Sequence, residues 1–424
     1  MPLIVQKYGG TSVGSPERIR AVARRVVNAR RRGASMVVVV SAMGDTTDDL
    51  LELARAVTGS DRVAAEHPRE LDMLLTAGER ISMALLAMAI RQLGESAISL
   101  TGSQAAIITD EVHTAARITE VRADRVREAV DRGDIVIVAG FQGVSRTREI
   151  TTLGRGGSDT TAVALAAAMK ADRCEIYTDV PGVYTADPRK VKEARVIPEI
   201  SYAEMLELAT SGAQVMHARA VEIASRFGVD IWVGSSFTEH PDAPGTLITR
   251  TPKRMEDLVL TGIAAQGGQA KLIIRGIPAG MRSVTAVLVA LADAGISVDM
   301  IAEARDSGGG SQLEATIAEA QLADARRVIE RVLAELGGGQ VEWSGSLARV
   351  ALVGSGMHQR PGVYARAFRT LLEAGVEVSA VSTSGISITL WVPEEKQDAA
   401  VAALHGAFSL ELAGAAGNQG EGKG

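Results

Sequence analysis

Apolar runs and amphipathic segments alternate over the first 250 residues of the chain. The run at 36–40 is uninterrupted, which is typical of a central strand in a parallel sheet. Further strands are predicted at 3–6, 97–100, 135–140, 174–178 and 231–233, and helices at about 16–32, from 48, at 78–93 and at 162–170. This alternation predicts an α/β fold with an open, mostly parallel sheet sandwiched by helices.

The pattern changes near Thr251, where a linker precedes shorter, repeated elements. The phrases at 293–298 and 373–378 match in place, so we expect two βαββα(β) modules of the split βαβ type. A strand at 257–264 could complete one of them. The predicted organisation is a first domain at 1–250, a joining segment at 251–264, modules at 265–345 and 346–412, and a disordered Gly-rich tail at 413–424.

Composition narrows the class of protein. The chain has 424 residues, a net charge of -6 and one cysteine, Cys174. The acidic balance argues against broad binding to nucleic acid or to a membrane surface. A single cysteine in a strand-like segment predicts inert packing and a reducing compartment. No signal peptide and no apolar run of membrane-spanning length are recognised, so a cytoplasmic protein is expected.

Residues suited to binding a ligand are concentrated at 151–161, a stretch that has three glycines and precedes an Ala-rich helix. Arg155 offers a planar fork of donors to a carboxylate or phosphate. Ser158, Asp159 and Thr160 are predicted to cap the helix, whose positive dipole end would face the same pocket. An ordinary Gly-rich turn with a capped helix remains the alternative.

Two more segments carry charged groups to the expected sheet edge. Lys7 ends the first strand and is followed by Gly9 and Gly10, a strand–turn–helix arrangement that can cradle phosphate. It is not a P-loop, because the lysine precedes the glycines. Glu79 begins a long helix, where it could be a cap or could hold an ammonium group. The alternative for Lys7 is a solvated side chain beside an ordinary turn.

Five ordered segments, at 7–12, 41–47, 76–82, 153–161 and 178–189, resemble aspartate kinases of the amino acid kinase type, and the two modules resemble ACT regulatory domains. The resemblance implies transfer of the ATP γ-phosphate to the side-chain carboxylate of L-aspartate, giving 4-phospho-L-aspartate and ADP. This is the first step toward lysine, threonine and methionine. A carboxylate is already ionised at pH 7, so the reaction needs positioning and charge neutralisation rather than a general base.

The resemblance also implies roles for individual residues. The residues with implied catalytic roles are Lys7, Gly10 and Asp179. Those implied to contact aspartate are Ser41, Thr47, Glu79, Arg155 and Ser158. Those implied to contact the nucleotide are Lys7, Tyr8, Gly9, Gly10, Thr178, Asp179, Tyr184, Arg189 and Gln214. The implied cofactors are ATP and Mg²⁺, and no residue is assigned as a metal ligand. Asp159 and Asp179 have plainer alternatives, a helix cap and a turn.

Some positions depart from the family pattern. Gln214 stands where the family usually has a lysine that grips ATP phosphates, and Arg219 could partly substitute for it. The module loops also lack the usual pair of amides, where Glu303 and Ala304 stand, and the usual glutamate, where Gly385 stands. Amino-acid effectors such as lysine or threonine would meet Ile277, Asp299, Met300, Glu303, Ser382 and Thr383. We therefore expect weak or absent inhibition by lysine plus threonine, the alternative being drift in a still-sensitive enzyme.

Other readings stay open at this point. The chain could be an amino acid kinase for another acid, or a catalytically weak amino-acid-sensing protein. ACT modules are expected to pair across chains into a homodimer or homotetramer. Met255 resembles an internal start for a separate regulatory subunit, but it could be an ordinary linker methionine. His217 is expected to cap or pack, since no histidine pair has metal-ligand spacing.

Overall fold

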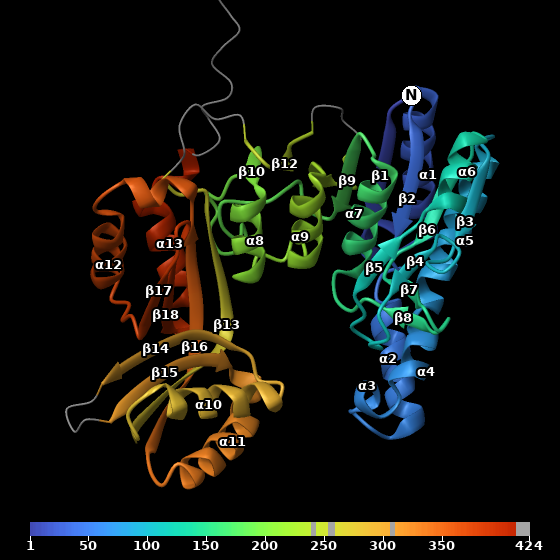
Figure 1. Cartoon of the computed structure of the whole chain (residues 1–424). Coiled ribbons are helices and arrows are strands. Elements are labelled where there is room, and N and C mark those ends of the chain that lie inside the picture. Colours follow the sequence, from blue (N-terminus) through green and yellow to red (C-terminus); the bar gives the residue numbers. More distant parts are fainter. Residues whose placement is uncertain (239–242, 253–258, 306–309, 413–424) are drawn as a thin grey trace, which may run out of the picture. The chain divides into compact units, whose positions relative to one another are not determined.

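The computed structural model describes residues 1–238, 243–252, 259–305 and 310–412 (Figure 1). The chain divides into two compact units. Unit 1 comprises Met1–Tyr184, Val196–Thr210 and Gln214–Met255, and unit 2 comprises Thr185–Arg195, Ser211–Ala213 and Glu256–Gly424. Met255 and the predicted tail at 413–424 lie outside the described residues.

Unit 1 is built on an eight-stranded sheet in the order β10-β12-β11-β9-β1-β2-β6-β3. The strands are β1 (Leu3–Tyr8), β2 (Ser35–Val40), β3 (Ala97–Leu100), β6 (Ile135–Ala139), β9 (Arg173–Thr178), β10 (Glu199–Ser201), β11 (Ile231–Ser235) and β12 (Gly245–Thr249). β11 and β12 pair antiparallel, whereas β9, β1, β2, β6 and β3 are joined by parallel ladders. The predicted open, mostly parallel sheet is confirmed.

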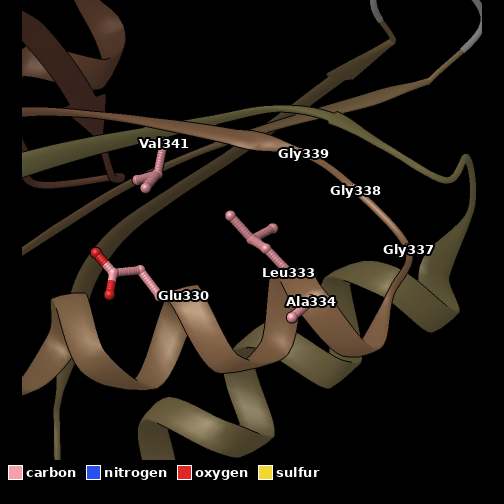
Figure 2. Close-up of a pocket in the computed structure, with 7 residues that line it drawn as sticks. All are labelled: Glu330, Leu333, Ala334, Gly337, Gly338, Gly339 and Val341. Atoms are coloured by element: carbon pink, nitrogen blue, oxygen red, sulfur yellow. The ribbon is translucent and has the colours of Figure 1, made fainter.

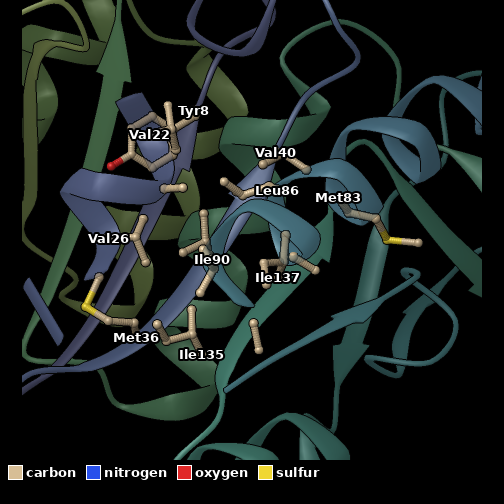
Figure 3. Packing of buried hydrophobic residues seen from close by; sticks show 14 of the residues in the cluster. Tyr8, Val22, Val26, Met36, Val40, Met83, Leu86, Ile90, Ile135 and Ile137 are labelled. Carbon is tan, nitrogen blue, oxygen red and sulfur yellow. The ribbon is translucent and has the colours of Figure 1, made fainter. Parts of the chain in front are cut away.

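Helices α1 and α5 share the core of this sheet (Figure 3). The helices of unit 1 are α1 (Pro16–Arg31), α2 (Thr46–Thr58), α3 (Val63–Glu66), α4 (Pro68–Leu75), α5 (Ala77–Gln92), α6 (Asp124–Asp131), α7 (Gly157–Met169), α8 (Tyr202–Thr210) and α9 (Ala218–Phe227). Helix α1 begins where Ser15 accepts from Arg18 N and Pro16 supplies a preset φ. Its Val22 and Val26 pack with Leu86 of α5 against β2. Burial of these aliphatic faces fixes the strand ends that carry the site.

The segment Pro68–Gln92 corrects one expectation. It is long and apolar enough by composition to cross a membrane, although no such run was recognised in the sequence. Half of its most apolar window is buried inside the protein, and Leu86 and Ile90 are fully buried in the unit 1 core. The segment therefore serves as a core helix pair in this fold.

A second, four-stranded sheet lies in unit 1, in the order β5-β4-β7-β8. Its strands are β4 (Ile107–Thr109), β5 (Ile118–Val121), β7 (Gln142–Ser145) and β8 (Ile150–Thr152). The sequence pattern predicted no strand between β6 and the Gly-rich stretch, but β7 and β8 form a hairpin there. These strands are too short and too polar to show a period-2 pattern.

Unit 2 holds a six-stranded sheet in the order β14-β15-β13-β16-β18-β17. Its elements are β13 (Gly262–Ile277), α10 (Met281–Asp293), β14 (Val298–Arg305), β15 (Ser311–Ala318), α11 (Leu322–Glu335), β16 (Gln340–Val353), α12 (Val363–Glu373), β17 (Ala380–Thr383), β18 (Ser387–Pro393) and α13 (Gln397–Ala407). This is the repeated strand–helix–strand–strand–helix order that the sequence predicted.

Two long strands join the halves of this sheet. Residues 269–275 of β13 pair with 340–347 of β16, beside β15 and β14, whereas residues 262–266 pair with 349–353, beside β18. The second module therefore includes residues 262–266 of β13, which precede the first module along the chain. The short gap in register at Gln266 and Gln269 marks the change from one half to the other.

A hollow in unit 2 lies between the end of α11 and the start of β16 (Figure 2). It is lined by Glu330, Leu333, Ala334, Gly337, Gly338, Gly339 and Val341. Glu330 is its single ionisable side chain, and none of the residues predicted for a site lines it.

Candidate active site

The carboxyl ends of β9, β1, β2 and β6 lie side by side at one edge of the unit 1 sheet. Gly44 N donates to Gly10 O at 3.0 Å, so the loops after β1 and β2 meet main chain to main chain. A Cβ at Gly10 would lie 3.0 Å from the carbonyl oxygens of Ala42 and Gly44. Glycine, which has no Cβ, permits this close approach, so backbone groups of both loops lie together at the sheet edge.

Lys7 is held at this edge by Asp159. Lys7 Nζ lies 2.6 Å from Asp159 Oδ1, and the two side chains are 12% and 11% exposed. A Cβ on Gly9 would come 3.6 Å from Lys7 Nζ, so the ammonium group lies over the glycine turn. The pairing places a fixed positive charge beside the loop that is expected to meet a phosphate.

The predicted caps of α7 are wrong. The N-cap is Gly156 in a left-handed conformation, and no side chain caps the helix. Asp159 pairs with Lys7 instead, and Thr160 Oγ1 donates to Gly156 O at 3.0 Å. The first turn of α7 therefore keeps its N–H groups uncapped by side chains, which preserves an anion-attracting helix end at the sheet edge.

The loop before α7 carries Arg155 and is fixed from both sides. Arg155 itself is exposed, whereas Ser158 is buried against the end of β6, where a Cβ on Gly140 would lie 2.7 Å from Ser158 Oγ. Arg219 donates to Leu153 O at 2.6 Å and to Ala116 O at 2.8 Å. Two main-chain carbonyls thus engage the guanidinium group of Arg219, and its substitution for the missing lysine stays a prediction.

His217 has the structural role that the sequence suggested. Its side chain accepts from Arg219 N at the start of α9. A Cβ on Gly156 would lie 2.2 Å from the His217 side chain, so the imidazole packs on the turn before α7. Cys174 is likewise structural, because burial raises the pKa of its thiol far above the ordinary value.

Glu79 is the buried acid of the site. It is 3% exposed, and its Oε1 accepts from Ala42 N at 3.2 Å. Its Oε2 has no hydrogen-bond partner among the described residues. Burial raises the pKa of Glu79 to about 7, although the backbone N–H groups of Glu79 and Ala42 lower it. A buried carboxylate oxygen without a partner favours a cationic ligand.

The end of β2 and the start of α5 hold Glu79 in place. Ser82 Oγ donates to Ser41 O at 2.7 Å. A Cβ on Gly78 would lie 2.7 Å from the Ala42 Cβ, so the helix can approach the strand end this closely only with glycine. Thr47 lies half-buried in the first turn of α2, which follows the same strand. Ser41, Thr47 and Glu79 therefore share one strand end.

The residues predicted for the nucleotide are more dispersed. Thr178 ends β9 and donates to the exposed Asp179 at 3.0 Å, while Tyr184 forms a bridge to Val196. The Tyr8 side chain is fully buried and stacks on Tyr177 with ring centroids 4.9 Å apart. Only the main chain of Tyr8 is left to face a ligand.

Two further residues were predicted to meet the nucleotide, Arg189 and Gln214. Arg189 lies in unit 2 and is paired with Asp187 at 2.8 Å. Gln214 is exposed. Both assignments stay predictions.

Sequence reasoning missed two carboxylates. Asp159 was read as a helix cap, and its pairing with Lys7 follows from the packing of α7 on β1, which spacing does not reveal. Asp72 was not singled out, yet it is fully buried and accepts from Thr152, His113 and Thr114. The sequence did indicate a role for Asp72, because an aspartate inside the apolar run of α4 needs buried hydrogen-bond partners.

The site therefore offers complementary groups within unit 1. A lysine, an open helix start and glycine-lined main chain can stabilise anionic charge. A buried carboxylate can hold an ammonium group, and an exposed arginine can pair with a carboxylate. No group placed as a general base is needed if the nucleophile is itself a carboxylate.

Comparison with known proteins agrees with this chemistry. A model of the amino acid kinase family matches residues 2–235, and a model of the ACT domain matches residues 350–408. The aspartokinase of Mycolicibacterium smegmatis is 48% identical over 415 residues, covering 97% of each chain. Both the family match and this relative span enough of the chain to fix its family.

Solved structures give the same result. E. coli aspartokinase III in complex with aspartate and ADP aligns with a TM-score of 0.80 at 27% identity, covering 96% of this chain and 99% of that one. The same enzyme in complex with lysine and aspartate aligns with a TM-score of 0.71 at 27% identity and the same coverage. The chain belongs to the aspartokinase family of ATP-dependent kinases, whose phosphoryl acceptor is a carboxyl group.

Proposed function

We propose that the protein phosphorylates the side-chain carboxylate of L-aspartate with ATP, giving 4-phospho-L-aspartate and ADP. The observation that carries this proposal is Glu79, a buried carboxylate whose Oε2 lacks a hydrogen-bond partner among the described residues. An amino acid brings the ammonium group that such an oxygen favours. The aspartate bound by E. coli aspartokinase III supports the same substrate.

The remaining groups suit the other ends of the substrate. Arg155 can form a bidentate pair with the α-carboxylate, while Ser41, Thr47 and Ser158 can donate or accept around the amino acid. A side-chain oxygen of aspartate would then attack the γ-phosphorus, and the bond from that phosphorus to the bridging oxygen of ADP would break. Lys7, with the glycine main chain, would neutralise charge that develops on the transferred group.

Mg²⁺ is the cation that such kinases use, and it neutralises the nucleotide phosphates when bound. Among the described residues no group of three or more His, Cys, Asp or Glu side chains is arranged so that it could hold a metal ion. The paired Asp159 and the exposed Asp179 are the carboxylates near the expected phosphate path. This donor set fits a cation carried mainly by the phosphates, with Asp179 as the protein group able to approach it.

A substrate panel tests the proposed acceptor. Acyl phosphate formed from ATP and Mg²⁺ can be trapped with hydroxylamine, using L-aspartate, L-glutamate or N-acetylglutamate, and ADP release can be followed with UMP. We expect turnover with L-aspartate alone. Turnover with another acceptor would reassign the substrate, and no turnover with any of them would favour the amino-acid-sensing alternative.

Gln214 is expected to weaken nucleotide binding, because an amide replaces the positive charge usual at this place. The variant Gln214→Lys should lower the KM for ATP about fivefold, as one added charged contact contributes about 1 kcal/mol. Gln214→Met, which has no donor, is the matched control and should raise it. Unchanged KM and kcat for ATP in Gln214→Lys would remove the basis of this assignment.

We infer that feedback inhibition by lysine plus threonine is weak or absent. In unit 2 three of the six residues predicted to meet an effector already have partners inside the chain. Asp299 pairs with Arg349, Ser311 Oγ donates to Glu303 at 3.1 Å, and Met300 N donates to Thr316 Oγ1 at 3.0 Å. Ile277 is buried in the module core, whereas Ser382 and Thr383 lie on β17.

Initial rates with and without both amino acids at millimolar concentration test this inference. The wild-type protein should keep most of its activity. A triple variant that restores the usual groups, Glu303→Gln with Ala304→Asn and Gly385→Glu, should gain inhibition, and nothing lies within 4 Å of a Cβ built at Gly385. Strong inhibition of the wild type would contradict the inference. Lysine is a relevant effector to test, because E. coli aspartokinase III has been solved in complex with it.

We further propose that the product leads toward lysine, threonine and methionine, and that unit 2 assembles into a homodimer or homotetramer. β14 and β17 are the outermost strands of its sheet, so their free ladders favour pairing with another chain. Size measurement in solution tests the assembly. A separate regulatory subunit starting at Met255 is tested by looking for the short product in an expressing cell.

A further inference from the structure

Asp72 of α4 is a fully buried carboxylate that the proposed chemistry does not use. Its Oδ1 accepts from Thr152 Oγ1 at 2.5 Å and its Oδ2 lies 2.7 Å from His113 Nδ1. Thr114 N donates to both oxygens, at 3.1 and 3.2 Å. Three partners from two separate segments thus converge on one side chain.

Thr114 is held in a strained backbone conformation. Its φ is +65°, in the left-handed region that a β-branched residue rarely adopts. Such a residue persists only where its surroundings fix it. The two hydrogen bonds from its main-chain N–H to Asp72 are the contacts that hold it.

The strained turn touches the loop that carries Arg155. Thr114 O lies 3.1 Å from the place of a Cβ on Gly154, the residue before Arg155. Two residues on, Ala116 N donates to Thr152 O at 2.9 Å, and Arg219 ties Ala116 O to Leu153 O. The main chain that leads into Arg155 therefore rests on the turn that Asp72 holds.

Asp72 is also linked rigidly to Glu79. It lies in α4, which ends at Leu75, and α5 begins at Ala77 with Glu79 in its first turn. Gln142 Nε2 donates to Thr76 O at 3.2 Å, which ties the junction of the two helices to β7 of the same small sheet. A single carboxylate thereby connects the element that presents Glu79 with the loop that presents Arg155.

We infer that Asp72 is a positioning residue for the amino-acid substrate, setting the distance between the groups for its ammonium and its α-carboxylate. This inference rests on the proposed roles of Glu79 and Arg155. Asp72 does not touch the substrate. It acts through Thr114 and Thr152, and the nucleotide side of the site, around Lys7 and Thr178, has no hydrogen bond to it among the contacts of the described residues.

The test is steady-state kinetics of the full-length Asp72→Asn variant. Asparagine keeps the size but turns one acceptor oxygen into a donor, which would face the donors of His113, Thr114 or Thr152. The KM for aspartate should rise about 10- to 100-fold, since a displacement of about 1 Å in a positioning group can cost about 100-fold. The KM for ATP should change less than about twofold.

A rescue separates positioning from mere loss of stability. Glycine adopts a left-handed φ freely, so Thr114→Gly removes the strain that Asp72 holds. The double variant Asp72→Asn with Thr114→Gly should recover much of the affinity for aspartate. The exposed Asp131→Asn is the matched control and should leave both KM values unchanged.

Each outcome bears on the inference. Unchanged KM for aspartate in Asp72→Asn, or equal rises for aspartate and ATP, would overturn it. If that variant does not fold, Thr152→Val removes one donor at constant size and should raise the KM for aspartate alone. An Arg155→Ala variant with unaltered KM for aspartate would instead refute the proposed substrate site and leave the contacts of Asp72 without that role.

Discussion

Replacing Lys7 with methionine should lower kcat by about 100- to 1000-fold, the range seen when one preorganised donor to transition-state charge is removed. Methionine keeps an unbranched side chain one atom shorter than that of lysine and removes its charge. Lys7 Nζ lies over the Gly9 turn and 2.6 Å from Asp159, so its positive charge is fixed at that point. ADP release at saturating aspartate and ATP measures the effect.

The same substitution leaves Asp159 without its partner. Since the pair is only about one-tenth exposed, an unpaired carboxylate there should destabilise unit 1 by up to about 3 kcal/mol. The double variant Lys7→Met with Asp159→Asn removes the buried charge and should recover thermal stability without recovering kcat. A Lys7→Met protein whose kcat stays within threefold of the wild type would show that the lysine is structural.

The sequence predicted the strands and glycines around Lys7 but not its pairing with Asp159. The valines of β2 are buried on both faces, which is why their uninterrupted run predicted a central strand. The glycines and Glu79 were found because strand ends collect ligand groups in such sheets. Asp159 was misread as a cap, because a carboxylate in the first turn of a helix has that local role far more often.

The small sheet was missed for a related reason. β4 and β8 contain three residues each, which is too short to establish a period, and β7 contains a glycine. Their stability comes from tertiary contacts such as the 2.7 Å hydrogen bond between Thr109 and Thr151. Asp72 belongs to the same class, because its partners are 41 or more residues away along the chain.

Glu79 should control the pH dependence of aspartate use. The pKa of Glu79 is about 7 in the protein, so the carboxylate that would hold the substrate ammonium loses its charge below that pH. We expect kcat/KM for aspartate to fall about tenfold per pH unit below about pH 6 and to level off above about pH 8. The profile is measured at constant ionic strength with ATP saturating.

Glu79→Gln is the matched variant, with the same shape and no titration. It should lower kcat/KM for aspartate at pH 8 by about 100- to 1000-fold, because losing one member of a buried charge pair costs about 2–5 kcal/mol. Its kcat/KM should also show no inflection near pH 7. An unchanged inflection in this variant would assign the titration to another group.

Stability provides an independent check with a definite sign. The pKa of Glu79 rises from an ordinary 4.5 to about 7 on folding, so the folded state binds more protons between these values. The stability that protonated Glu79 contributes is fully present below about pH 4.5 and is lost as the pH rises through about 7. Between pH 5 and 8 the wild type should therefore lose about 3 kcal/mol relative to Glu79→Gln, measured by urea unfolding.

Bound aspartate should remove most of this loss, since its ammonium group would give the buried carboxylate a partner. A loss that aspartate does not reduce would count against Glu79 as the ammonium-binding group.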